Sequence, residues 1–291
     1  MGQLIGRAAW GTSRPPRIAA NRTLIPKAFS SVSEARNCLE FYSHTFTLGF
    51  GSAYGNSAVH AGHGVQRRYD MTAYLDVFCR WSTAFDAMIT TQYQDMTERE
   101  KYAAQVLQMQ RLDFSTALGV ISGSTGVDDQ MLWDKYVGTF EMIISVAESV
   151  LKQSTSPVQR TSSERTPLFT LDIGIVGPLY DVARRCRDPA VRRKAICLLS
   201  TYPRLEGMWD SVLAARVAER VLLIEENGLG AVNCCADVPD WARTSEVHPI
   251  FDLEQKKALV YYQRCGSTYN TSRTTLQEMI EWGAERTPIQ G

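Results

Sequence analysis

The strongest constraint on the fold lies in the segment Phe169–Gly228, where the sequence marks the ends of neighbouring helices. Asp188 is an N-cap acceptor placed directly before Pro189. Proline suits the first helical position because the N–H that it lacks would have no intrahelical partner there. The helix that begins at this point should end near Tyr202, because Pro203 disfavours the α conformation of the residue before it.

A second helix of this segment should open around Trp209–Ser211, with Asp210 as its N-cap. Its apolar residues recur at helical spacing, and Gly228 is suited to the position just past its end. The apolar stripe comprises Leu213, Val217, Val221 and Ile224. Two short antiparallel helices joined by a tight turn are the repeating unit of an α-solenoid, so the segment predicts stacked helix pairs.

Helical periodicity continues upstream of this segment. Apolar residues recur at steps of three and four in two ranges, Tyr74–Met88 and Trp133–Leu151. Between these ranges, Thr97 and Glu100 match a capping box that precedes a third long helix, expected over Tyr102–Val120. The upstream sequence therefore predicts long amphipathic helices, with a less regular one before them over residues 33–46.

The connections and the C-terminal part have a different composition. Gly49–Gly64 and Lys152–Thr166 are rich in small and polar residues and are expected to be loops. Arg243–Ile250 and Lys257–Cys265 are β-branched or aromatic stretches around a polar turn, which predicts a hairpin. A last helix is expected over Thr274–Trp282.

Together these patterns predict an all-α fold of stacked antiparallel helix pairs, similar to an α-solenoid, with a small C-terminal β-hairpin. Three parts are expected along the chain. Residues 1–65 form an N-terminal arm, the first helix and a Gly-rich loop, and residues 66–228 form a helical core with a linker near 152–166. Residues 229–291 form the hairpin and terminal helix, packed on the same domain.

Charge and cysteine content exclude several classes of protein. Lys plus Arg and Asp plus Glu both number 31, so no global positive field favours binding to a polyanion. No apolar run approaches the roughly 18 residues of a membrane span, and no secretory signal is visible, so an intracellular soluble protein without a membrane partner is expected. Seven cysteines spread along the chain fit a reducing compartment.

The motifs of residues 171–219 resemble, in their order, the helical regulatory region that follows the six-cysteine finger in fungal zinc binuclear cluster transcription factors. They are Leu171–Gly174, Pro178–Tyr180, Arg185–Pro189, Arg192–Ala195, Pro203–Ser211 and Ala214–Glu219. A weaker likeness extends over about residues 29–265. The resemblance implies an all-helical regulatory fold of fungal origin, often found beside secondary-metabolite genes. The Cys-x2-Cys-x6-Cys pattern of the finger is absent, so no direct DNA binding is expected.

Candidate site residues concentrate in the turn before the second helix. There a tryptophan and a carboxylate could line a pocket, and the alternative is that Asp210 only caps the helix that follows. We expect Trp209 to be buried between the two helices of the segment. The candidate catalytic residues are His44, Asp210 and Glu206, and the candidate ligand-binding residues are Trp209, Arg204, Trp81 and Tyr180.

Other polar groups have both a functional and a structural interpretation. His44 could transfer protons at neutral pH, or it is simply a packed or surface residue. His60 and His63 could chelate a metal ion, but a solvated loop is favoured and no metal or other cofactor is predicted. A basic cluster could bind an anion or an import receptor, or could lie on exposed helix faces paired with acids. It comprises Arg184, Arg185, Arg187, Arg192, Arg193 and Lys194.

Two functions remain open from the sequence. The favoured one is a transcription-factor-like regulatory domain without a finger, which binds a small-molecule metabolite or a protein partner, in the nucleus or the cytoplasm. A homodimer is left open. The alternative is a cofactor-free enzyme of fungal secondary metabolism, an isomerase or cyclase built on the same fold, because the fold alone does not decide the function.

Overall fold

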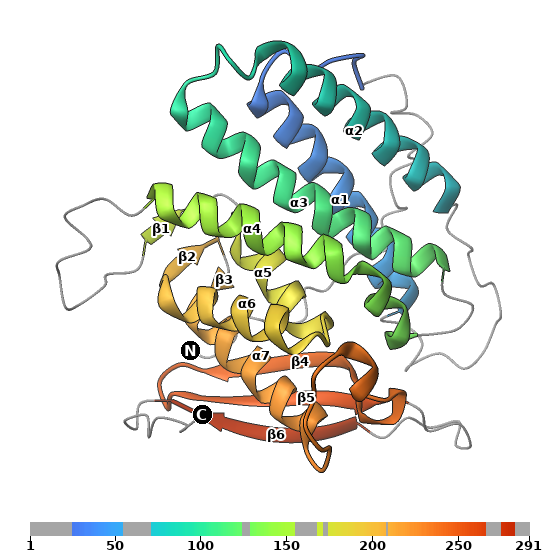
Figure 1. The fold of residues 1–291 in the computed structure, drawn as a ribbon, viewed down its shortest axis with the longest axis vertical. Helices are drawn as coiled ribbons and strands as arrows, with labels where there is room; N and C mark the ends of the chain where they lie inside the picture. The colour runs from blue at the N-terminus through green and yellow to red at the C-terminus, as the bar shows by residue number, and fades with distance from the viewer. Residues whose placement is uncertain are drawn as a thin grey trace. The chain divides into compact units, whose positions relative to one another are not determined.

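The computed structural model describes residues 25–54, 71–123, 129–154, 168–170, 174–207, 209–265 and 275–282. Helices predominate among them, and their stacked antiparallel pairs confirm the predicted fold class (Figure 1). The chain separates into two compact units, 1–122 and 123–291. This boundary falls inside the predicted 66–228 core, and the three-part domain division stays a prediction.

The described residues of the N-terminal unit form three helices. They are α1 (Val32–Tyr54), α2 (Met71–Gln92) and α3 (Glu98–Gly123). The indole nitrogen of Trp81 in α2 donates a hydrogen bond to the carbonyl of Ala35 in α1 at 2.9 Å. The five residues between α2 and α3 form a short connection, which returns the chain alongside α2.

The local signals of this unit are largely confirmed. The N–H of Glu100 donates to Oγ1 of Thr97, and the N–H of Thr97 donates to the Glu100 carboxylate, which is the predicted capping box. The expected loop does not begin at Gly49, because α1 continues to Tyr54. Once a helix has formed, it passes through a glycine at a cost of only about 1 kcal/mol. Residues 55–64 of that loop lie outside the described residues.

The C-terminal unit begins with stacked helices. They are the 3-10 helix η2 (Gln130–Tyr136) and the α-helices α4 (Val137–Ser154), α5 (Val176–Arg185), α6 (Pro189–Thr201) and α7 (Ser211–Glu226). Helix α4 packs on α5 and α6, while α5, α6 and α7 pack on one another. The Trp133 stripe predicted one regular helix, but its first turns are 3-10 rather than α.

Both predicted N-caps are confirmed. The Asp188 side chain accepts hydrogen bonds from the first N–H groups of α6, at 3.0 Å from Ala190 and Val191. Asp210 does the same for α7, at 2.8 Å from Val212 and 3.1 Å from Leu213. These caps satisfy N–H groups that have no partner inside the helix, so the two helices begin where the sequence predicts.

The described part of the C-terminal unit also contains two small sheets. The first has strand order β1-β2-β3 and was not expected from the sequence. The second is antiparallel, with order β4-β5-β6, and its first two strands confirm the predicted hairpin. The strands are β1 (Leu168–Thr170), β2 (Arg204–Glu206), β3 (Trp209–Asp210), β4 (Thr244–Asp252), β5 (Lys257–Arg264) and β6 (Thr275–Glu281).

The helix predicted at Thr274–Trp282 is wrong, because this segment forms strand β6. Strand β6 pairs with β5 along its whole length, from Lys257 opposite Glu281 to Gln263 opposite Thr275. This pairing satisfies backbone groups of β5 that would otherwise lie on an open edge, and tertiary pairing of this kind overrides a weak local helix preference.

Candidate functional site

The structure brings together five of the seven candidate residues in the C-terminal unit, where α5 meets β2 and β3. They are Tyr180, Arg204, Glu206, Trp209 and Asp210. The guanidinium of Arg204 lies 3.2 Å from the carboxylate of Glu206, and both side chains are buried. Glu206 also accepts a hydrogen bond of 2.8 Å from the N–H of Val176 in the first turn of α5. A carboxylate is stabilised at this helix end, so Glu206 holds α5 to β2.

Asp210 and Trp209 also have structural contacts. Asp210 caps α7, which agrees with the alternative interpretation of this residue. The indole of Trp209 packs on Tyr180, with ring centroids 5.4 Å apart, and is 37% exposed. The expectation that Trp209 is buried between two helices is therefore wrong. It lies in β3, the last strand of its sheet.

Gly174 leaves the space that the Glu206 carboxylate occupies. A Cβ at this position would lie 2.4 Å from Oε1 of Glu206, which Arg204 and the Val176 N–H hold in place. We expect Gly174→Ala to lower the free energy of unfolding by about 1–3 kcal/mol, the usual cost of overpacking. Denaturant unfolding of the two proteins measures this difference.

Gly138 in α4 is the matched control for this substitution. A Cβ there meets no atom within 4 Å, so Gly138→Ala should raise stability by about 0.5–1 kcal/mol through its helix propensity. Equal effects of the two substitutions would show that the close approach of Glu206 to Gly174 has no energetic consequence.

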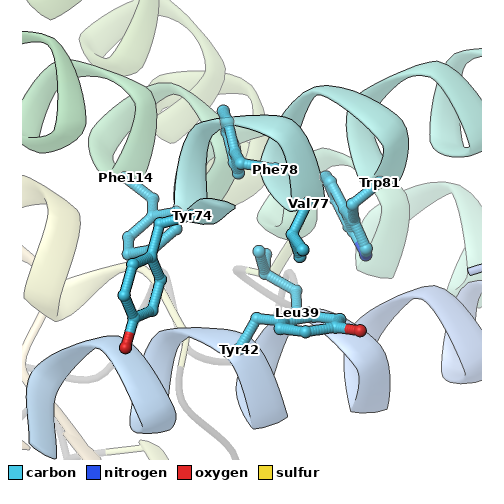
Figure 2. Close-up of a pocket in the computed structure, with 7 residues that line it drawn as sticks. All are labelled: Leu39, Tyr42, Tyr74, Val77, Phe78, Trp81 and Phe114. Carbon is cyan, nitrogen blue, oxygen red and sulfur yellow. The ribbon is translucent and has the colours of Figure 1, made fainter. Parts of the chain in front are cut away.

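An apolar pocket lies in the N-terminal unit between α1, α2 and α3 (Figure 2). The enclosed space between its side chains is small, about 10 Å³, which is no more than a single water molecule needs. Its lining residues are Leu39, Tyr42, Tyr74, Val77, Phe78, Trp81 and Phe114. Five of the seven are aromatic residues, so the lining is apolar and aromatic.

The candidate residue Trp81 lines this pocket. Its ring stacks on that of Phe85 with centroids 5.1 Å apart, and its N–H is already bonded to Ala35, so only its apolar surface is offered to a ligand. Burial raises the pKa of Tyr42, the nearby Cys38 adds to this rise, and the phenol is neutral at physiological pH. The lining residues include no charged side chain, so the pocket offers hydrophobic and aromatic contacts rather than acid or base catalysis.

The remaining candidate histidines are not placed. His44 belongs to α1, but its side chain lies outside the described residues, as do His60 and His63 entirely. The described residues contain no group of three or more His, Cys, Asp or Glu side chains arranged to hold a metal ion. Among the same residues, none of the helices combines the length and apolar character that a membrane crossing requires.

The basic cluster divides into surface and buried members. Arg185 pairs with Asp181 at 2.9 Å and Arg193 with Glu226 at 2.6 Å, so these side chains match the paired, structural interpretation. Arg187 and Arg192, by contrast, are each only 1% exposed, and for these two an exposed helix face is wrong. Both side chains form ion pairs with one buried acid of α7.

That acid is Glu225, which is 0% exposed and was not singled out from the sequence. Its carboxylate lies 2.9 Å from Arg187 and 2.7 Å from Arg192, and it accepts hydrogen bonds from the N–H and hydroxyl of Thr244. Burial opposes ionisation of Glu225, but the two guanidinium groups outweigh it and hold its pKa down, at about 2. The network joins the α5–α6 link, α6, α7 and β4.

One sequence signal could have identified Glu225. It lies four residues after Val221 and seven after Ala218, and both of these are buried on the apolar face of α7. An acid in register with an apolar stripe must find a positive partner inside the protein. Arg192 carries the matching signal, because it lies three residues before the buried Ala195.

Comparison with known proteins supports the resemblance to fungal transcription regulators. Over 100 residues the chain is 39% identical to the aspercryptin biosynthesis cluster-specific transcription regulator of Emericella nidulans. The aligned part is 33% of this chain and 16% of that regulator, so the match spans about a sixth of the relative's length. No protein-family model matches the chain, and no solved structure is significantly similar to it.

Proposed function

We propose that this chain is a regulatory region of the fungal transcription regulator type, which responds to a small apolar metabolite. The observation that carries the proposal is the 39% identity to a cluster-specific transcription regulator. The name of that relative also suggests a role beside a biosynthetic gene cluster and action in the nucleus. The helical fold agrees with such a role without deciding it.

The polar candidate residues favour regulation over catalysis. Glu206 is engaged by Arg204 and by the N–H of Val176, and Asp210 is engaged as a helix cap. A general acid or base must be able to reach a substrate proton, and these carboxylates already hold the backbone in place. No observation on the described residues favours the isomerase or cyclase alternative.

The aromatic pocket of the N-terminal unit is the proposed ligand site. The enclosed space is far smaller than the about 300–1,000 Å³ of pockets for drug-sized ligands, so the lining side chains must move apart before a ring can enter. The proposed occupant is a small apolar metabolite or the ring of a larger one, because the lining is apolar and largely aromatic. The same pocket could receive an apolar side chain of a protein partner, and the experiment below separates the two.

Val77→Phe tests the site, because Val77 and Leu39 lie next to each other in the lining and a larger ring at Val77 would block entry of a ligand (Figure 2). Small aromatic compounds, with indole and naphthalene as first probes, should raise the melting temperature of the wild-type protein and leave that of Val77→Phe unchanged. Leu223→Phe is the control, since Leu223 is exposed on α7 of the other unit. Equal shifts in all three proteins would contradict a ligand site here.

If the aromatic probes raise the melting temperature of none of the three proteins, an apolar side chain of a protein partner becomes the favoured occupant. In that case the proposal predicts that Val77→Phe weakens the regulatory response of the whole protein without ligand. Filling a true cavity is close to neutral for stability, whereas overpacking costs about 1–3 kcal/mol, so the unfolding curve of Val77→Phe also reports whether the space is empty.

We expect the purified chain not to bind DNA specifically. It has no net charge to attract phosphates, and specific recognition also needs side chains that read base edges. Titration of labelled duplexes at physiological salt should show only weak binding that is insensitive to sequence. Nanomolar binding that is lost when one base pair is changed would contradict this expectation.

A further inference from the structure

The sheet β4-β5-β6 has two edge strands, which differ in how well they are protected against further pairing (Figure 1). Strand β4 contains Pro249, which has no N–H to donate, and its register with β5 shifts between Ser245 and His248. Strand β6 contains no proline, and its pairing with β5 is regular along its length. In the part of the sheet that the structure describes, β6 pairs on one side only. It is therefore an edge that can accept another strand.

The open edge of β6 presents the backbone groups of every second residue. The N–H of Trp282 donates to the carbonyl of Lys256 at 2.9 Å, so the backbone of Trp282 points towards β5. In an antiparallel pair this direction alternates from one residue to the next. The N–H and C=O groups of Gln277, Met279 and Glu281 therefore point away from β5, to the side where a further strand would lie.

A row of apolar side chains crosses one face of the sheet and reaches this edge. Ile250, Leu259 and Met279 lie opposite one another on the three strands. Ile250 and Met279 are each 60% exposed. The other face is covered, because α7 packs on β4 and β6 and Arg220 of α7 forms an ion pair with Glu278. Within the described sheet, the exposed row ends at Met279 without a further apolar neighbour.

We propose that two copies of this chain pair through β6, antiparallel and with Met279 opposite the partner's Met279. The pairing joins the two three-stranded sheets into one and makes the apolar row continuous across both copies. The two-fold axis passes between the methionines, so Gln277 lies opposite the partner's Glu281 and Glu281 opposite the partner's Gln277. In this register the outward N–H and C=O groups of all three residues bond to those of the facing residue. The homodimer that the sequence leaves open thereby takes a specific form.

The side chains of β6 are complementary to themselves in this register. The amide of Gln277 faces the partner's Glu281 carboxylate and donates to it, and the two-fold symmetry repeats this contact. On the covered face, Glu278 lies opposite the apolar Ile280 of the partner subunit. A register centred on Glu278 would instead set two carboxylates directly opposite each other, which is unfavourable. A second copy of the chain is therefore the occupant that fits this edge.

The pairing is expected to be weak. It buries one strand edge and the end of one side-chain row in each copy, less than the about 1,000 Å² in total that a stable interface buries. Monomer and dimer should therefore exchange in solution, so the test traps the dimer covalently.

Met279→Cys tests the pairing under mild oxidation of the full chain. Facing residues of a hydrogen-bonded antiparallel pair have Cα atoms about 5.5 Å apart, a separation that a disulfide can span. In the working background serine replaces the exposed Cys79, Cys197 and Cys234, which could otherwise cross-link. We expect a disulfide-linked dimer on a non-reducing gel, which dithiothreitol converts back to monomer. Met279 is exposed, so the substitution should leave the circular dichroism spectrum unchanged.

Two matched variants locate the contact. Ile250→Cys is equally exposed on the same face but lies on the far edge strand, so it should stay monomeric. The two copies of Gln277→Cys would lie about 14 Å apart along the joined sheet, four residues of strand, which is too far for a disulfide.

Three results would overturn the proposal. They are cross-linking of Ile250→Cys as readily as Met279→Cys, which indicates association of the sheet faces; cross-linking of Gln277→Cys, which indicates another register; and no cross-linking of Met279→Cys, which shows that the edges do not pair. The proposal rests on the C-terminal sheet alone, so these results say nothing against a ligand site in the N-terminal unit.

Discussion

Replacing Glu225 with alanine is expected to lower the free energy of unfolding of the C-terminal unit by about 3–5 kcal/mol, because it leaves two arginines buried without their counter-charge. It also removes the acceptor of the Thr244 N–H and hydroxyl. Since domains are stable by only about 5–15 kcal/mol, the loss is a large fraction of the total. Denaturant unfolding measures it, and hydrogen exchange of α6 and α7 assigns it to this unit.

Glu226 is the matched control one residue away. Its ion pair with Arg193 lies at the surface, where Arg193 is about half exposed, so Glu226→Ala should cost no more than about 1 kcal/mol. If Glu225→Ala and Glu226→Ala lower the free energy of unfolding by similar amounts, the buried Glu225 network is no more stabilising than a surface ion pair.

The pH dependence of stability provides a second test of Glu225. Its pKa is about 2 in the folded protein, below the 4.5 of a free glutamate. The folded state therefore binds this proton less readily than the unfolded state, and the contribution of Glu225 is complete above about pH 4.5 and is lost as the pH falls towards about 2. In Glu225→Ala this part of the acid destabilisation should disappear.

Trp81→Ala should destabilise the N-terminal unit by about 3–5 kcal/mol, the range for removing a large aromatic ring from a core. Trp81 is 1% exposed, and the substitution also leaves the carbonyl of Ala35 without its donor. Thermal unfolding followed by circular dichroism measures the effect. Because the loss is structural, this variant does not test ligand binding, which is why Val77→Phe is the probe of the pocket.

Trp241 is the control for Trp81. It is 58% exposed, so Trp241→Ala should change the unfolding free energy by less than about 0.5–1 kcal/mol. A Trp81→Ala protein as stable as Trp241→Ala would contradict the placement of Trp81 in the core of α1 and α2.

Helix boundaries could be predicted because their signals are local. Asp188 beside Pro189, and Thr97 with Glu100, act within one turn of chain and need no distant partner. Strand β6 could not be predicted in the same way, because its conformation depends on pairing with β5. The exposure of Trp209 likewise depends on its place in an edge strand, which its own neighbours in sequence do not specify.

The candidate site was predictable only in part. Arg204, Glu206 and Trp209 are close in sequence, so their meeting in space was expected, although their hydrogen bonds turned out to hold the fold together. The aromatic pocket combines residues from three helices. Of these residues, only Trp81 was predicted from the sequence to bind a ligand. The ion pair of Arg187 with Glu225 joins positions far apart in the sequence, and nothing next to either residue in the sequence predicts the pairing.

The most direct measurement of the central claim is a reporter assay in a fungal host, with the full chain fused to an unrelated DNA-binding domain. If the chain is a regulatory region, the fusion should change transcription from the cognate site relative to the DNA-binding domain alone, and Val77→Phe should alter this response while Leu223→Phe leaves it intact. Transcription identical to that of the DNA-binding domain alone, from a fusion shown to be expressed and folded, would contradict the account.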